Sequence, residues 1–490
     1  MSRRSSSSSW PVPERRALVL LVLAFVLALP GVTLRIYASD EIQFFSYLRS
    51  LWFDRDVEFE NEYRHFYDQG TAADDLFHET FLERTSPTGL RLNFGTIGSG
   101  LLWSPFYAVA DLSVRLARAG GSPIPADGHA WPYVAAVCWG SALYGLLALV
   151  CSWAGARHVL RGVGLRSHPP AVAAVWAVWL GTPLLFYMYV APVMSHAPSA
   201  FGVACFVLVW LRVRDRYTIA GLAALGALAA LMAMLREQDV LFALGPAVDL
   251  VWRAWTTRQW RRLTGVAAAV ATFTIVFLPQ AMSYLVLNGR IGPSQVTSRK
   301  MAWSSPHAWE ALASPEHGFF LWTPIAILAV AGLFVLFVRP GPRDLGTPEA
   351  PAPAEARRLA TSLLVMLAAQ VYIVGSVESW TLAGAFGQRR FVSLTPLLVI
   401  GLAVLLARAR TSLGRVMLVT VSVIAVWWNI GLMVQFGAGL MDRQRLDLAA
   451  NTYNTFVTVP RVLPAVAWRY VFDRGSFYRR PTPSDDPGRR

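Results

Sequence analysis

Two adjacent carboxylates, Asp40 and Glu41, follow the first hydrophobic segment of this chain directly. Burying a charged side chain near a membrane costs free energy, so such residues often have a function. This pair is therefore typical of a site of chemistry rather than of membrane anchoring. The structural alternative is that both groups cap the following helix, because acidic side chains favour a helix N-terminus. We expect Asp40 and Glu41 to be catalytic, with capping as the alternative.

A pair of arginines, Arg389 and Arg390, stands at the start of a later hydrophobic segment, after Gly384 and Gly387. Glycine backbone and two guanidinium groups are suited to meeting a phosphate, because guanidinium forms paired hydrogen bonds to phosphate oxygens. The structural alternative is snorkelling of both arginines to the membrane surface. We expect Arg389 and Arg390 to bind substrate.

Four further polar residues are expected on the same side of the membrane. His196 opens a helix after a proline, Arg236 lies in the short turn Arg-Glu-Gln-Asp between two spans, and Glu316 and His317 form an adjacent pair. Each has an ordinary alternative: a structural hydrogen bond for the histidines and Glu316, and a local ion pair with Glu237 or Asp239 for Arg236. We expect all four to contribute to substrate binding, because charged groups at the ends of hydrophobic helices are functional when they face a cavity.

The composition indicates a polytopic membrane protein. Hydrophobic residues make up 55% of the chain, the mean hydropathy is +0.43, and apolar runs of transmembrane length recur. Lys300 is the only lysine beside 43 arginines, which indicates a preference for arginine codons rather than a nucleic-acid-binding surface. The three cysteines lie in apolar segments without the spacing of a metal site or disulfide framework.

The apolar segments predict an all-α bundle of about 11 transmembrane helices. The predicted spans are 17–35, 131–155, 169–188, 193–211, 218–235, 240–252, 264–287, 318–338, 359–377, 391–407 and 416–437. Residues 1–16 are expected to be a disordered cytoplasmic tail, residues 17–437 the membrane domain, and residues 438–490 a polar, extracytoplasmic tail.

Segment 98–118 is expected to lie on the outer interface instead of crossing the bilayer. Its apolar run is short and interrupted by Pro105, which is typical of an interfacial helix. The positive-inside rule supports this, because 17 arginines in later loops then fall on the cytoplasmic side, and one extra crossing would move them all outside. The nine arginines of the C-terminal tail run against this topology.

The first loop, residues 36–95, is then extracytoplasmic and carries 12 acidic residues against five arginines. Apolar residues at helical spacing follow the two carboxylates, so the loop is expected to contain interfacial helices. The cytoplasmic arginines have an ordinary role in insertion and contact with anionic lipid. The outer face is where function is expected.

In its organisation, the chain resembles the GT-C fold glycosyltransferases that depend on polyprenyl phosphate, including protein O-mannosyltransferases and lipid A aminoarabinose transferases. The resemblance rests on Ser39-Asp40-Glu41-Ile42-Gln43-Phe44-Phe45 after the first span, on the segment from Gly98 to Phe106, and on the segment from Gly384 to Phe391. At 98–106 the chain departs from relatives, since Ser104-Pro105 stands where paired prolines are common. The acceptor class is therefore left open.

The resemblance implies a sugar donor linked through one phosphate to a polyprenol, and transfer to a hydroxyl on the extracytoplasmic face of the inner membrane. The enzyme would be a hexosyl- or pentosyltransferase of the cell envelope. Asp40 would act as general base in an inverting displacement, a role that accelerates reactions roughly 10² to 10⁴-fold. Arg236, Arg389 and Arg390 would stabilise the leaving phosphate.

Several points stay open from the sequence. Glu41 would orient Asp40 or the acceptor, or help to hold Mg²⁺ or Mn²⁺, since paired carboxylates at a phosphate site suit such ions. The acceptor is a lipid, a glycan or a protein. The alternative class is a transporter or lipid flippase, whose folds often show repeated halves; no internal repeat is visible here. A noncatalytic membrane scaffold is the third interpretation.

Overall fold

A computed structural model describes residues 12–72, 74–165, 168–258, 264–339, 353–382 and 384–477. Every regular element in these ranges is helical, apart from two isolated bridges, Thr85 with Arg91 and Met301 with Val377. The predicted disordered start of the chain falls mostly outside the described residues. The expectation of an all-α protein is confirmed for the described part of the chain.

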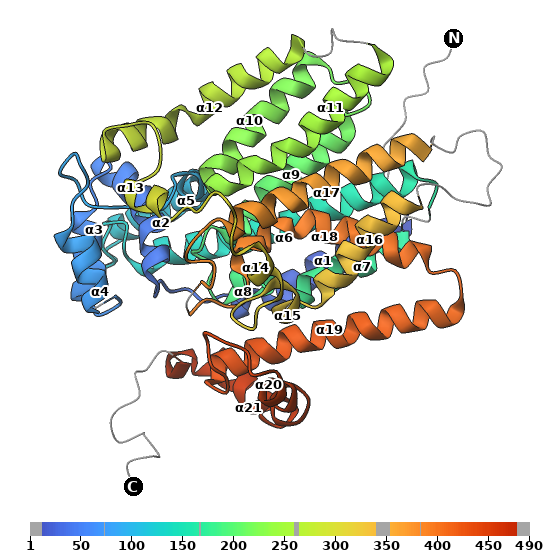
Figure 1. Ribbon diagram of the computed structural model, residues 1–490. Coiled ribbons are helices and arrows are strands. Elements are labelled where there is room, and N and C mark those ends of the chain that lie inside the picture. The colour runs from blue at the N-terminus through green and yellow to red at the C-terminus, as the bar shows by residue number, and fades with distance from the viewer. Residues whose placement is uncertain are drawn as a thin grey trace.

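Long apolar helices form the body of the molecule (Figure 1). Within the described ranges, six are long and apolar enough to cross a bilayer, which makes this a multi-pass membrane protein. They are α6 (Trp131–Gly162), α9 (His196–Val213), α12 (Gly265–Asn288), α17 (Pro353–Gly375), the continuous segment Arg389–Arg408, and α19 (Ser412–Ala438).

The other predicted spans correspond to shorter helices. Two of these, α10 (Ile219–Leu235) and α16 (Ile325–Val338), are apolar throughout. The rest are α1 (Val12–Ala28), α7 (His168–Gly181) with α8 (Leu184–Tyr189), and α11 (Leu244–Thr257). Of the eleven predicted spans, six therefore meet the length and hydropathy of a full crossing.

Two of the predicted spans are broken by proline. Span 169–188 is divided at Thr182-Pro183, and span 318–338 is divided at Thr323-Pro324, between α15 (Phe319–Trp322) and α16. Proline disfavours helical backbone in the residue before it and cannot donate a backbone hydrogen bond, so a helix ends or restarts there.

The first loop folds into short helices at one end of the bundle. These are α2 (Ser39–Arg49), α3 (Glu60–Asp68) and α4 (Asp75–Phe77), and in Figure 1 they gather at the left with α13 (Gln295–Arg299). The next helix, α5 (Gly98–Ala119), packs on α2 and α6. Although it has 22 residues, α5 is not among the six helices apolar enough to cross a bilayer, and its place on the outer interface stays a prediction.

The C-terminal tail returns to the same end. Beyond α19 come α20 (Leu448–Tyr453) and α21 (Val459–Phe472), below the bundle in Figure 1. The hydroxyl of Tyr470 donates to the carbonyl of Gly31 at 2.9 Å, and Arg474 donates to the carbonyls of Val32 and Pro30 at 2.5 and 2.7 Å. These carbonyls lie between α1 and the first loop, so the tail and the first loop share one end.

A buried ion network joins three helices near the arginine-rich loops. The carboxylate of Asp249 on α11 pairs with Arg214, which follows α9, at 2.9 Å and with Arg358 on α17 at 2.7 Å. A buried carboxylate is tolerated where several charged donors surround it. The arginines of this end are thus partly structural, in addition to any role in insertion.

The remaining short helices cover the end that carries the first loop. Among them are α14 (Ala308–Ala313) and two of the 3₁₀ turns, η4 (Glu237–Ala243) and η6 (Arg389–Leu394). The second of these leads directly into α18 (Thr395–Arg408). Turns of this kind interrupt regular helix at the ends of spans and leave polar side chains free to point inward. Both 3₁₀ turns border the cavity described next.

Candidate active site

A cavity of about 720 Å³ opens at the end of the bundle where the first loop folds. Its wall comes from segments far apart in the chain: the start of α2, the loop before α5, the turn after α10, the stretch around α13, and the residues that precede α18. The sequence-predicted residues Asp40, His196, Arg236, Arg389 and Arg390 all line it. The structure therefore brings together five of the eight predicted site residues.

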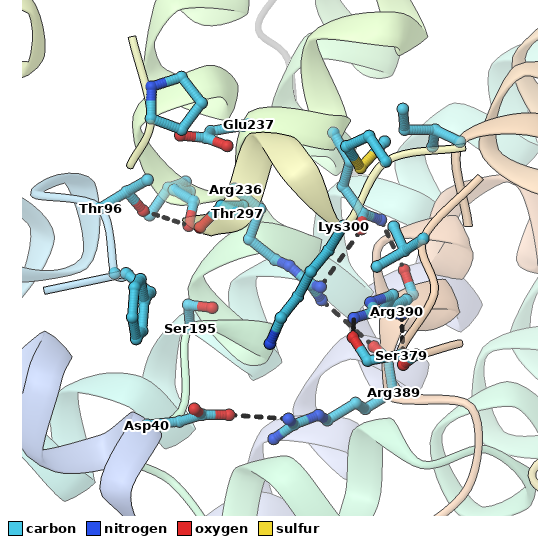
Figure 2. A pocket seen from close by; sticks show the side chains of 18 of the residues that line it. Asp40, Thr96, Ser195, Arg236, Glu237, Thr297, Lys300, Ser379, Arg389 and Arg390 are labelled. Carbon is cyan, nitrogen blue, oxygen red and sulfur yellow. Dashed lines mark hydrogen bonds and ion pairs between the residues drawn. The ribbon is translucent and has the colours of Figure 1, made fainter. Parts of the chain in front are cut away.

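Asp40 and Arg389 form an ion pair across this cavity. Oδ2 of Asp40 lies 2.7 Å from Nη2 of Arg389 (Figure 2), and the two side chains are 41% and 20% exposed. Asp40 is the second residue of α2, so its carboxylate projects from the first helical turn. A carboxylate and a guanidinium group thus meet within reach of a molecule entering the cavity.

Arg236 is held beside this pair by neighbours from two other segments. Its Nη1 donates to Nδ1 of His196 at 2.6 Å and to the carbonyl of Arg389 at 3.3 Å. Gln238 braces the same region by donating to the carbonyl of Arg390 at 2.9 Å. Among the described residues, Arg236 takes these partners rather than the ion pair with Glu237 or Asp239 that the sequence left open.

Arg390 completes a cationic wall. Its guanidinium donates to the carbonyl of Ser379 at 2.9 Å and to the hydroxyl of Ser379 at 3.2 Å. Both of these partners are neutral, so the two hydrogen bonds do not cancel its positive charge. Arg236, Arg389 and Arg390 therefore present three guanidinium groups to one cavity, an arrangement suited to a phosphate group.

Lys300 adds a fourth cation that the sequence analysis did not place in the site. It follows α13 directly, is exposed, and lines the cavity. In Figure 2 its side chain extends between Arg236 and the Asp40–Arg389 pair. The one signal in the sequence was its rarity: a single lysine among 43 arginines. The rarity of lysine does not predict where the loop after α13 folds. Only the structure shows that Lys300 lines the cavity.

Glu41 does not line the cavity, although it is adjacent to Asp40. Its carboxylate is buried and accepts hydrogen bonds from the backbone amides of Tyr37 and Ala38 at 2.9 and 3.2 Å. This is the capping arrangement that the sequence offered as its alternative. Burial raises the pKa of Glu41 to about 8, so the group keeps its proton over much of the neutral range.

Glu316 and His317 also lie away from the cavity wall. The His317 ring is buried, stacks on Trp322 with centroids 4.6 Å apart, and lies with Nε2 2.8 Å from the carbonyl of Ala385. Ala385 lies four residues before Arg389. His317 thus supports the loop that carries the arginines, and substrate binding by Glu316 and His317 stays a prediction.

Asp40 and Glu41 were considered as ligands of a divalent cation. Their side chains have different surroundings. Asp40 faces the cavity and Arg389, whereas Glu41 faces its own backbone. Among the described residues, no three histidine, cysteine, aspartate or glutamate side chains gather into a metal-binding group.

Comparison with solved structures shows a structural likeness to a membrane protein. The chain is similar to ArnT from Cupriavidus metallidurans in the apo state, with a TM-score of 0.44 and 16% sequence identity over 95% of this chain and 75% of that chain. No protein-family model matches the chain, and no curated protein matches it. The site's own residues therefore carry the functional inference.

Proposed function

We propose that this protein is an integral membrane glycosyltransferase that moves a sugar from a polyprenyl-phosphate donor to an acceptor hydroxyl. The observation that carries the proposal is the Asp40–Arg389 pair inside a cationic cavity. It places a group able to accept a proton 2.7 Å from a group able to hold a phosphate. A glycosyl transfer from a sugar phosphate needs both functions at one site.

The reaction is a single displacement. Asp40 takes the proton of the acceptor hydroxyl while that oxygen forms a bond to the anomeric carbon of the sugar. The bond between the anomeric carbon and the phosphate oxygen breaks, and its electron pair stays with the polyprenyl phosphate. One displacement inverts the anomeric configuration, by the logic of single-step carbohydrate chemistry.

The four cations act on the leaving group. Negative charge grows on the phosphate as the bond breaks, so Arg236, Arg389, Arg390 and Lys300 stabilise the transition state more strongly than the bound donor. Arg389 has a double role, because it contacts the base and can contact the phosphate. When the donor binds, its phosphate would take part of the interaction of Arg389 with Asp40. The weakened ion pair would make the Asp40 carboxylate a better proton acceptor.

An apolar part of the wall suits the lipid portion of the donor. Leu241, Trp303, Tyr372 and Ile373 line the cavity on the side of η4 and α17, and Trp303 and Tyr372 are exposed at 64% and 42%. A polyprenyl chain can stay in the bilayer while its phosphate reaches the cations. The proposal keeps the side of the membrane expected from the loop arginines, the extracytoplasmic surface of the inner membrane, with a lipid, glycan or protein as the acceptor.

The test is sugar transfer by Asp40→Asn, which keeps the size of the side chain and removes the base. In membranes with matched protein levels and a panel of polyprenyl-phosphate sugars, we expect transfer to fall at least about 100-fold. The control is Asp68→Asn, an exposed carboxylate of α3 outside the cavity, which should keep wild-type transfer.

Two results would contradict the proposal. Equal transfer by the wild type and Asp40→Asn would remove Asp40 from the chemistry. No transfer by either protein with any donor, together with net movement of a solute or lipid in proteoliposomes, would favour a transporter instead.

A further inference from the structure

A second acidic group, Glu237, lines the same cavity away from the base. Figure 2 shows Glu237 on the opposite side from Asp40 and Arg389, with Arg236 and Lys300 reaching between the two sides. Glu237 is absent from the ion pairs found in the described residues, whereas Asp40 is paired. It is therefore a carboxyl group that the phosphate chemistry above does not use.

The partner of Glu237 is a tyrosine. The hydroxyl of Tyr284 on α12 donates to Oε1 of Glu237, and Tyr284 is itself buried. Burial raises the pKa of Glu237, and the hydrogen bond from Tyr284 opposes part of this effect. A carboxyl group held in place by a tyrosine hydroxyl is a positioned hydrogen-bonding group at the cavity wall.

The position of Glu237 is fixed by close packing behind it. Thr96 donates to the carbonyl of Leu235 at 3.0 Å, and the amide of Ile97 donates to Gln280 on α12 at 2.9 Å. Gly98 lies so close to the backbone of Met234 that a Cβ atom there would approach it to 2.4 Å. The start of α5, the end of α10 and α12 are thus locked together around this carboxyl group, and a locked group can discriminate between ligands.

The charges of the cavity wall limit which class of sugar can bind at Glu237. The wall carries four cations, Arg236, Lys300, Arg389 and Arg390, against two carboxyl groups. An ammonium group on the sugar would be repelled by the net positive charge of the wall. A sugar carboxylate held at Glu237 would bring two hydrogen-bond acceptors together. A neutral sugar avoids both penalties, because its hydroxyls can donate to a carboxyl oxygen and to the nearby threonine hydroxyls without carrying charge.

We infer that Glu237, positioned by Tyr284 and flanked by Thr96 and Thr297, forms the subsite that holds the sugar ring of the donor, and that this ring is a neutral sugar rather than an amino sugar or a uronic acid. The inference rests on the proposed function, since it assumes that the phosphate occupies the cationic side. It assigns the two sides of the cavity to the two parts of one donor headgroup.

The experiment compares binding of lipids that differ only in the headgroup. Purified wild-type protein is titrated with polyprenyl phosphate, with polyprenyl-phosphate mannose, glucose or arabinose, and with polyprenyl-phosphate aminoarabinose. We expect at least one neutral sugar to tighten binding about 10-fold over polyprenyl phosphate alone, the effect of one or two hydrogen bonds to a buried polar group. The amino sugar should give no such gain.

The variants separate the subsite from the phosphate site. Glu237→Ala should lose the gain from the sugar while binding polyprenyl phosphate like the wild type, which also shows that the variant is folded. Tyr284→Phe keeps the carboxyl group but frees it, and should lose part of the gain. Retained gain in Glu237→Ala, or tighter binding of aminoarabinose than of every neutral sugar, would overturn the inference and leave the proposed function standing. Failure of the wild type to bind polyprenyl phosphate would instead count against the proposed function.

Discussion

Asp40 and Glu41 are neighbours, yet their side chains leave α2 in directions about 100° apart, because a helix turns by that angle at each residue. One direction leads into the cavity and the other to the backbone before the helix. The first carboxylate is paired with Arg389 and the second caps the helix that holds the first. Of the two roles weighed from the sequence, Glu41 makes the capping contacts, and catalysis by Asp40 stays a prediction.

Glu41 should control stability rather than chemistry. Its pKa is raised from 4.5 to about 8, so the folded protein holds a proton that the unfolded chain releases. The free energy of unfolding therefore falls as the pH rises from about 4.5 to about 8, and the contribution of Glu41 is fully present only below that window. Glu41→Gln stays neutral and can still accept from the amides of Tyr37 and Ala38.

We expect Glu41→Gln to match the wild type in Tm near pH 5, to exceed it at about pH 9, and to keep most of its transfer activity. Thermal unfolding in detergent at the two pH values, with transfer measured in parallel, checks this. Loss of transfer at every pH with an unchanged Tm would return Glu41 to the catalytic role that the sequence predicted.

The residues of the cavity were partly predictable. Charged groups at the ends of hydrophobic segments led to Asp40, Arg236 and Arg389, because burying a charge near a bilayer has a cost that marks the position. Lys300 and Glu237 were not assigned roles, because their place depends on how a loop and a 3₁₀ turn fold over the cavity. The contacts of His317 could not be predicted, because no spacing in the sequence reveals a buried ring that stacks on Trp322 and lies against a backbone carbonyl.

At the scale of elements, hydropathy located a helix for every predicted span, since a long apolar run in a membrane protein has few alternatives to helix. It did not locate the breaks. Pro183 and Pro324 divide two spans, and the residues from 237 to 243 form a 3₁₀ turn where a span was expected to begin at 240. Mean hydropathy does not detect such breaks, yet the turn after α10 supplies Arg236 and Glu237 to the cavity.

The docking of the tail on the first loop is a contact between elements at opposite ends of the chain. Arg474 holds two carbonyls at the end of α1, so Arg474→Ala should lose both charged hydrogen bonds and lower stability by about 1–3 kcal/mol. Thermal unfolding measures the loss, and limited proteolysis should cut the tail faster. Arg461→Ala, an exposed position on α21, is the matched control. Equal protection of the tail in both variants would show that Arg474 does not fasten it.

At the scale of the whole molecule, the two ends of the bundle differ in charge and in the elements that they carry. The end with the first loop carries the cavity, the acidic loop and the tail, and the other end carries the arginine-rich connections. Exposed tryptophans occur near both ends, with Trp303, Trp309 and Trp468 on one side and Trp252 and Trp255 on the other. Indole rings favour the boundary between lipid and water, so these positions are consistent with helices that cross between them.

The single lysine allows the cavity to be labelled at one position with an amine-reactive reagent. Apart from the amino terminus of the chain, Lys300 carries the only primary amine in the sequence, and it lies at the cavity with its side chain exposed. An amine-reactive dye that does not cross membranes should label the protein on intact cells if this end faces outward, and Lys300→Arg should abolish that label while keeping the charge. Polyprenyl phosphate should slow the labelling. Equal labelling of the arginine variant, or labelling only after the cells are opened, would contradict this orientation. One residue thereby reports both which way the molecule faces and when its cavity is filled.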